Sequence, residues 1–205
     1  MENDIKIRLM EESDFEDGSF LMSYAFKGKL PALKKFDEKD VADFMLAGGL
    51  FQKESLEGHY VAILNNKVVG IMHLDTYSQQ KNKIDAPLQS EYIIKKFGLI
   101  RSLISGISFL LLGHHLKKDE MIVDYIAVHP DFRGHGIGGN LLDFGEKIAK
   151  KTSGISRYTL RVIGKNIGAK RLYERKGFSV IKTRRALISS FFTGVKVYHN
   201  MEKII

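Results

Sequence analysis

The chain has 205 residues, of which 44% are hydrophobic and 27% charged, a balance typical of a soluble globular protein. This length is sufficient to bury a sizeable core and fits one domain, residues 1–205, better than two. There is no cysteine, which excludes a disulfide framework, a thiolate nucleophile and a cysteine-ligated metal.

The net charge of +8 is distributed unevenly along the chain. Residues 1–132 carry 16 Lys and Arg against 20 Asp and Glu, whereas residues 133–205 carry 16 against 4. The carboxyl-terminal part is therefore expected to contact something anionic, and the rest something neutral or cationic. Nucleic acid is not expected, because the basic residues are not interleaved with aromatic side chains. The start of the chain has neither a basic leader nor an apolar run, which predicts a cytoplasmic protein.

The amino-terminal region predicts a strand, two helices and a hairpin. Asn65 and Asn66 form the hairpin turn, because asparagine tolerates a positive φ between two apolar runs. The predicted elements are a strand at Ile5–Leu9, a helix that follows the acidic stretch Glu11–Asp17 and continues to about Lys29, a helix at Glu38–Leu50, and strands at His59–Leu64 and Val68–Leu74.

Residues 78–119 resemble an insertion between two strands. Apolar residues recur there at spacings of four and three, which predicts one amphipathic helix over residues 93–111. The uncharged stretch Ser102–Gly113 is too short to cross a bilayer, so no membrane contact is expected. The apolar stripe must be buried against the domain or against a second subunit of a homodimer. Its members are Ile93, Phe97, Ile100, Ile104, Ile107 and Leu111.

The carboxyl-terminal region alternates strands and helices, so the whole chain predicts a mixed α/β fold with hairpins at both ends. Gly145 is expected to let its helix pack closely on the sheet. The predicted strands and helices are Met121–Val128, Ile137–Lys151, Tyr158–Ile163, Asn166–Lys176, Phe178–Lys182 and Val195–His199.

A cluster of glycines at positions 134, 136, 138 and 139 joins the strand Met121–Val128 to the next helix. Without a Cβ the backbone can turn tightly, approach a ligand and leave its N–H groups free, and the following helix N-terminus favours an anion. The segment therefore predicts a phosphate site, although the same glycines also suit a purely structural turn.

The glycine spacing also matches the dinucleotide fingerprint G-x-G-x-x-G. That fingerprint follows its strand directly and precedes an acidic residue on the next strand. Here H-P-D-F-R separates Val128 from the glycines, and the strand Tyr158–Ile163 contains no acid. An NADP-dependent oxidoreductase remains an alternative, with Arg157 or Arg161 on a 2′-phosphate.

A second motif lies downstream, where Asn166 can cap a helix and Gly177 can end it. Together the two motifs resemble the GNAT family of N-acetyltransferases over about Met121–Phe178. The first motif of that family is matched by Arg133, Gly136 and Gly138 within the segment 133–138, and the second by Asn166, Ala169, Leu172, Tyr173, Gly177 and Phe178. Two linked motifs are far more specific than either alone.

The resemblance implies a single α/β (α+β) domain with a mixed, mostly antiparallel sheet that is flanked by helices and splayed where the cofactor enters. It implies acetyl-CoA as co-substrate and a primary amine, on a small molecule or a peptide, as acceptor. The insertion at about 78–119 would line or cover the acceptor site, and the negative charge of residues 1–132 suits a cationic amine. No metal is expected, because His114 and His115 lack partners at a recognisable ligand spacing.

The resemblance also implies which residues hold the cofactor. The pantetheine arm would pair with the strand at Ile126 and Val128, and the Val128 amide would stabilise the oxyanion. The diphosphate would bind the amides from Arg133 to Gly138, with a charged contact from Arg133. The cofactor-binding residues are then Ile126, Val128, Arg133, Gly134, His135, Gly136, Ile137, Gly138 and Asn166.

Two residues are implied as catalytic. Tyr173 would protonate the leaving sulfur, since a phenol keeps its proton at neutral pH. Asp124, expected on the same strand face as Ile126, would act as the base directly or through water. Both residues also have structural interpretations, a core tyrosine and a hydrogen-bond acceptor, and a noncatalytic acyl-CoA-binding module that docks a partner through the insertion helix remains an alternative.

Overall fold

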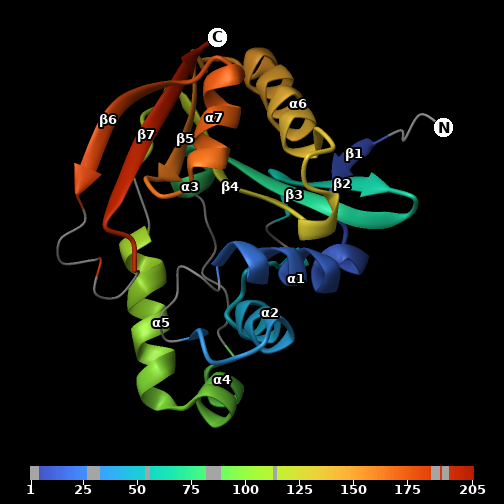
Figure 1. Cartoon of the computed structure of the whole chain (residues 1–205), viewed down its shortest axis with the longest axis vertical. Helices are drawn as coiled ribbons and strands as arrows, with labels where there is room; N and C mark the ends of the chain where they lie inside the picture. The colour runs from blue at the N-terminus through green and yellow to red at the C-terminus, as the bar shows by residue number, and fades with distance from the viewer. Residues whose placement is uncertain are drawn as a thin grey trace.

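The computed structural model describes residues 5–26, 33–53, 56–81, 89–112, 115–185, 190 and 194–205, with only the backbone described at 106–112. Seven strands form one sheet in the order β1-β2-β3-β4-β5-β7-β6 (Figure 1). Neighbouring strands are antiparallel except for β4 and β5, which are parallel. The strands are β1 (Lys6–Leu9), β2 (His59–Leu64), β3 (Lys67–Thr76), β4 (Glu120–Val128), β5 (Arg157–Ile163), β6 (Ser179–Arg185) and β7 (Val197–Ile204).

Helices cover both faces of the sheet. On one face, α6 (Ile137–Lys151) and α7 (Ile167–Arg175) enclose an apolar cluster that includes Leu141 and Tyr158, called the α6/α7 core below. On the other face, α1 (Phe15–Phe26) and α2 (Glu38–Ala47) enclose the α1/α2 core, which includes Leu21, Phe44 and Ile71. Two short 3₁₀ helices, η1 (Glu12–Asp14) and η5 (Pro130–Phe132), precede α1 and α6. The mixed, mostly antiparallel α/β fold is confirmed.

Several local predictions are confirmed in detail. The β2–β3 turn has Asn65 and Asn66 at φ 50° and 59°. The Asn166 side chain accepts a hydrogen bond from the Ala169 amide at the start of α7. A Cβ on Gly145 would overlap the Tyr158 hydroxyl, so only glycine lets α6 approach β5 this closely.

The ends of several elements differ from the sequence prediction. The second helix stops at Ala47, because Gly48 is its C-cap and the next residue, Gly49, adopts φ 77°. The last strand begins at Val197 and extends to Ile204. The predicted helix end near Lys29 lies outside the described residues.

The single helix predicted over residues 93–111 is wrong. Between β3 and β4 the chain forms α3 (Tyr77–Lys81), α4 (Ser90–Phe97) and α5 (Leu99–Leu112). Gly98, at φ 82°, separates α4 from α5, so the residues of the apolar stripe are divided between two separate helices. The Phe97 ring packs against Phe36 and Phe44, with ring centroids 4.9 and 5.1 Å apart, whereas Ile100 is 73% exposed.

The side chains of Ile107 and Leu111, which complete the predicted stripe, lie outside the described residues. No helix within the described part of the chain has the length and apolar content needed to span a membrane.

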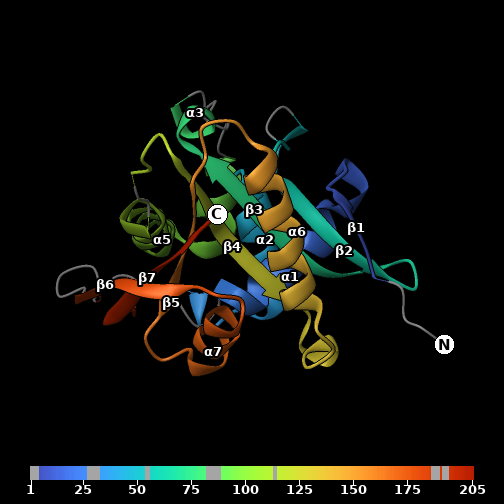
Figure 2. The ribbon, with the colours of Figure 1, turned by 90° about the horizontal axis from the view of Figure 1, so that it is seen from above.

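The parallel strands β4 and β5 stay paired over only part of their length. Their register runs from Glu120 opposite Arg157 to Val123 opposite Leu160. Beyond these pairs, residues 124–128 of β4 and 161–163 of β5 diverge, which Figures 1 and 2 show as an opening between the two strands. This β4–β5 wedge confirms the splayed sheet, and it lies beside the amino-terminal end of α6.

Candidate active site

The loop before α6 takes a conformation that requires glycine at two positions. Gly134 and Gly136 adopt φ 83° and 79°, and Gly136 is the N-cap of α6. A Cβ at either position would meet no heavy atom within 4 Å, so neither glycine is there to avoid a clash. The left-handed backbone itself therefore explains these two glycines.

This conformation leaves a run of backbone N–H groups without acceptors. The amides of residues 134–139 donate no hydrogen bond to any described residue, and the first amide of the helix that does so is Asn140, to Gly136. Residues 134–136 are exposed, and the positive end of the α6 dipole adds to the same surface. Consecutive free amides at a helix N-terminus form an anion site.

Gly138 and Gly139 serve a different purpose from the two loop glycines. A Cβ on Gly138 would lie 3.3 Å from Leu172 Cδ2, and one on Gly139 would lie 3.0 Å from Lys176 Cε. Both glycines therefore allow α6 and α7 to approach each other, beside the wedge. The sequence predicted that all four glycines let a phosphate approach the backbone. In the structure two of them, Gly138 and Gly139, instead make room for the neighbouring helix α7.

The edge of β4 that faces the wedge carries backbone groups at residues 124–128 that pair with no described strand on that side. The His129 amide donates to the Val69 carbonyl, so this pair is the hydrogen-bonded kind of an antiparallel ladder. Hydrogen-bonded and non-hydrogen-bonded pairs alternate along such a ladder, so Val128 and Ile126 belong to non-hydrogen-bonded pairs with β3. Their N–H and C=O groups therefore point away from β3 and toward β5. Because β5 has diverged there, an extended ligand can pair with β4 in its place.

Tyr173 lies on the α6/α7 side of the sheet. It belongs to the α6/α7 core together with Ile126 and Val128, and its ring centroid is 6.2 Å from that of Phe178. Burial raises the pKa of Tyr173 to about 12. The phenol therefore stays protonated at neutral pH, as a general acid must.

Asp124 does not share a face with Ile126, so that prediction is wrong. The register of β3 and β4 shifts between His73 and Leu74, and Asp124 is the additional residue of a β-bulge. The bulge reverses the alternation, so Asp124 lies with His73 on the side opposite Tyr173. Asp124 and Tyr173 thus flank the wedge from opposite faces of the sheet.

His73 is a candidate site residue that the sequence did not reveal. Its Nδ1 lies 3.4 Å from Asp124 Oδ2, and its side chain is 8% exposed. Its ring stacks on His59, with centroids 4.0 Å apart, and lies 5.3 Å from the Tyr125 ring. The imidazole therefore holds the carboxylate at the wedge, and the bulge that brings the two together leaves no sequence signal.

The remaining predicted cofactor residues lie around the loop. Arg133 is exposed, and its Nε donates to the Val128 carbonyl at 3.3 Å, which ties the loop to the end of β4. His135 is exposed and its Nδ1 lies 3.0 Å from the Arg133 carbonyl. Ile137 is buried in the α6/α7 core, so only its amide can contact a ligand. The side-chain oxygen of Asn166 is occupied by capping α7.

Solved structures that share this fold include several described as acetyltransferases. A protein described as an acetyltransferase is 28% identical, with a TM-score of 0.66, and the match covers 98% of this chain and 99% of that one. An N-acetyltransferase from Staphylococcus aureus Mu50 is 20% identical, with a TM-score of 0.65 and coverage of 97% and 100%. A putative acetyltransferase from Salmonella typhimurium, solved with acetyl-CoA, is 16% identical, with a TM-score of 0.59 and coverage of 98% and 94%.

A search of curated protein sequences finds no match. The family model described as the acetyltransferase (GNAT) family matches residues 29–178, which include the wedge, the glycine loop and α7. The free amides of the loop, the splayed strands and this match agree, and the chain belongs to the GNAT acetyltransferase family.

Proposed function

We propose that the protein transfers an acetyl group from acetyl-CoA to a primary amine by direct attack within a ternary complex. The observation that carries this proposal is the run of free amides at residues 134–139 beside the unpaired edge of β4. A diphosphate bound to these amides would leave the pantetheine arm to extend along Ile126 and Val128 into the wedge.

The two faces of the wedge supply complementary proton chemistry. The neutral amine attacks the thioester carbonyl carbon, and the Val128 amide stabilises the resulting oxyanion. The carbon–sulfur bond then breaks, and Tyr173 donates its proton to the departing thiolate. The amine proton passes to Asp124, which His73 holds at 3.4 Å, directly or through water. The acid and the base do not compete, because they lie on opposite faces of the sheet.

A thiol-release assay with acetyl-CoA and a panel of primary amines tests this proposal. We expect release of CoA that depends on the amine, together with a product heavier by one acetyl group. A noncatalytic acyl-CoA-binding module would bind CoA and release no thiol with any amine. An NADP-dependent enzyme would be stabilised against heat by NADPH and not by acetyl-CoA. A thermal-shift comparison of the two compounds therefore separates an NADP-dependent enzyme from an acetyl-CoA-dependent one.

The acceptor is proposed to reach the wedge from the side of Asp124, since the glycine loop and α7 lie on the other side. The same side carries the segment between β3 and β4, including α5 (Figure 1). Leu99, Ile100 and Leu103 of α5 are exposed, and they offer an apolar surface for the homodimer that the sequence suggested. Gel filtration with multi-angle light scattering tests the dimer, which a charged substitution at Ile100 would dissociate.

A further inference from the structure

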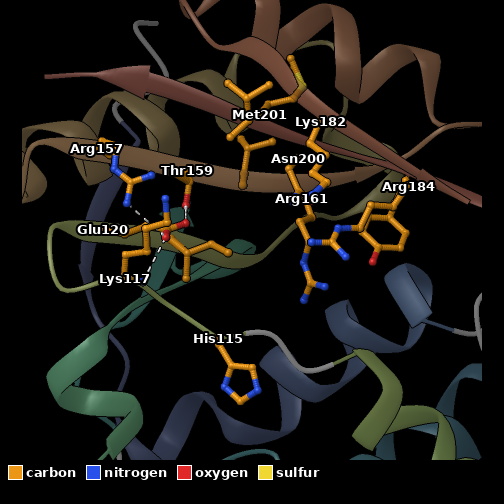
Figure 3. Close-up of a pocket in the computed structure, with 14 residues that line it drawn as sticks. His115, Lys117, Glu120, Arg157, Thr159, Arg161, Lys182, Arg184, Asn200 and Met201 are labelled. Carbon is orange, nitrogen blue, oxygen red and sulfur yellow. Dashed lines mark hydrogen bonds and ion pairs between the residues drawn. The ribbon is translucent and has the colours of Figure 1, made fainter. Parts of the chain in front are cut away.

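A second polar site lies on the face of the sheet away from α7. It is a pocket of about 500 Å³, within the range that small-molecule ligands occupy, between β4–β7 and the segment that follows α5 (Figure 3). Residues of β5 alternate between the two faces, so Tyr158, Leu160 and Val162 enter the α6/α7 core while Arg157 and Arg161 turn toward the pocket. Its polar lining includes Glu120, Arg157, Arg161, Lys182, Arg184 and Asn200.

The charges at one end of this pocket neutralise one another. Arg157 lies 2.8 Å from Asp119 and 3.1 Å from Glu202, and Glu120 accepts a hydrogen bond from Thr159 at 2.7 Å. These contacts connect β5 with the start of β4 and with β7. This end of the pocket is therefore structural and has little charge left for a ligand.

The other end of the pocket is basic. The side chains of Lys182 and Arg184 on β6 form no hydrogen bond or ion pair with any described residue, and both are exposed toward the pocket. Figure 3 shows Arg161 beside Arg184 there, and the Arg161 guanidinium lies 5.8 Å from the Tyr198 ring. Burial, and to a lesser degree the neighbouring charge of Arg184, lowers the pKa of Arg161. Arg161 interacts with Asp124 and Tyr198, whereas the side chains of Lys182 and Arg184 have no acidic partner among the described residues. The resulting excess of positive charge at this end favours an anionic ligand.

A further polar group in the wall has no hydrogen-bond partner in the described part of the chain. Asn200 Oδ1 is buried and accepts no hydrogen bond from the described residues. Buried oxygens are rarely left in this state, so a donor on a bound ligand would complete the pocket. The basic end also adjoins the wedge, because Arg161 is the first residue of β5 beyond its pairing with β4. The negative charge of Asp124 acts on the Arg161 guanidinium and raises its pKa, against the effect of burial.

We propose that Arg161, Lys182 and Arg184 bind an anionic group, a carboxylate or a phosphate, carried by the acceptor itself. The preferred acceptor is then a small molecule with a primary amine at one end and an anionic group at the other. Asp124 attracts the amine at the wedge while the basic end holds the anion. This inference rests on the proposed function, and it replaces the purely cationic acceptor that the charge of residues 1–132 suggested.

The experiment compares matched acceptors that differ in charge. ω-Amino carboxylates of three to six carbons are tested against their primary amides, and ω-aminoalkyl phosphates against the corresponding amino alcohols. We expect kcat/KM to be at least about tenfold higher for the anionic member of the best pair, as a charge-assisted contact would give. Comparison of the two series shows whether the anion is a carboxylate or a phosphate. Equal or better use of the neutral members would overturn the inference.

Variants on β6 test the assignment to these side chains. Lys182 and Arg184 are exposed, so K182Q combined with R184Q leaves the core unchanged. This variant is expected to reduce the preference for the anionic member about tenfold, mainly through KM. K147Q on the exposed surface of α6 is the matched control, and its preference should equal that of the wild type. A preference that survives K182Q/R184Q would contradict the proposal.

A binding measurement separates this inference from the proposed function. The same carboxylates and phosphates are titrated calorimetrically into protein saturated with CoA, where no turnover occurs. Binding of the anionic compounds without acetylation of any amine would contradict the transferase proposal and support the anion site. Acetylation of neutral amines without binding of any anionic compound would support the transferase and overturn the anion site.

Discussion

The two faces of the sheet present polar groups in different ways. On the α6/α7 side, the loop at residues 134–139 offers backbone N–H groups, and only glycine conformation and a helix terminus are needed to expose them. On the opposite side, the pocket depends on side chains from β5, β6 and β7 that meet only in the folded sheet. A backbone site therefore leaves a local motif in the sequence, whereas a side-chain site leaves almost none.

The two faces also differ in the surroundings of their ionisable side chains. The phenol of Tyr173 is buried among apolar residues and keeps its proton, whereas Asp124 lies at a more open edge, with a side chain that is 35% exposed. The wedge joins the two environments.

The largest effect is expected from Y173F. Removal of the proton donor should lower kcat by about 100-fold or more, while CoA affinity stays within about twofold of the wild type. Stopped-flow or steady-state thiol release, paired with calorimetry, measures both. Y158F is the matched control, because Tyr158 lies in the same core and donates only to the Leu142 carbonyl at 3.4 Å. A kcat for Y173F equal to that of Y158F would exclude the assigned role.

A smaller but still large effect is expected from G136V. A β-branched residue at φ 79° costs about 1–3 kcal/mol of strain, so CoA should bind roughly 10- to 100-fold more weakly if the loop must keep this shape. G154V is the control, since Gly154 also has a positive φ, 80°, and open space around it, but lies at the other end of α6. Equal CoA affinities for the two variants would show that the loop does not hold the cofactor.

On the opposite face, D124N should lower kcat about tenfold and leave CoA affinity unchanged. The amide retains the shape of the carboxylate beside His73 but accepts a proton poorly. D17N, at an exposed position in the first turn of α1, is the control for the loss of one negative charge. If D124N turned over as fast as D17N, water alone would have to remove the amine proton.

The smallest effect concerns stability at the structural end of the pocket. The hydrogen bond and the charge of Arg157 lower the pKa of Asp119 to about 2, below its usual value near 3.8. The folded state therefore gains stability that is complete above about pH 5 and is lost as the pH falls toward 2. R157Q should lower the Tm by about 2–4 °C at neutral pH, and the difference from the wild type should narrow in acid. Thermal unfolding followed by circular dichroism between pH 2 and 7 measures this, and a constant difference would contradict the assignment.

The sequence revealed what depends on local backbone geometry. The Asn65–Asn66 turn, the Asn166 cap, the close approach at Gly145 and the glycine loop all follow from conformational preferences of single residues. The family motifs connected the loop to α7 and so predicted the splayed sheet.

Features that depend on long-range pairing were missed or misjudged. One inserted residue in β4 moved Asp124 to the other face, and no periodicity argument detects a bulge. The apolar stripe over residues 93–111 suggested one helix, because its spacing continues through Gly98 although the backbone does not. The basic pocket could not be predicted from the sequence either, because Arg161 and Arg184 come together only when β7 pairs between β5 and β6.

The central claim is that the amides of residues 134–139 hold the diphosphate of CoA and direct its sulfur into the β4–β5 wedge. A crystal structure with bound CoA tests it most directly. We predict diphosphate oxygens within about 3 Å of several of these amides and the sulfur between Val128 and Tyr173. CoA bound elsewhere, with the loop amides contacting only solvent, would contradict the account.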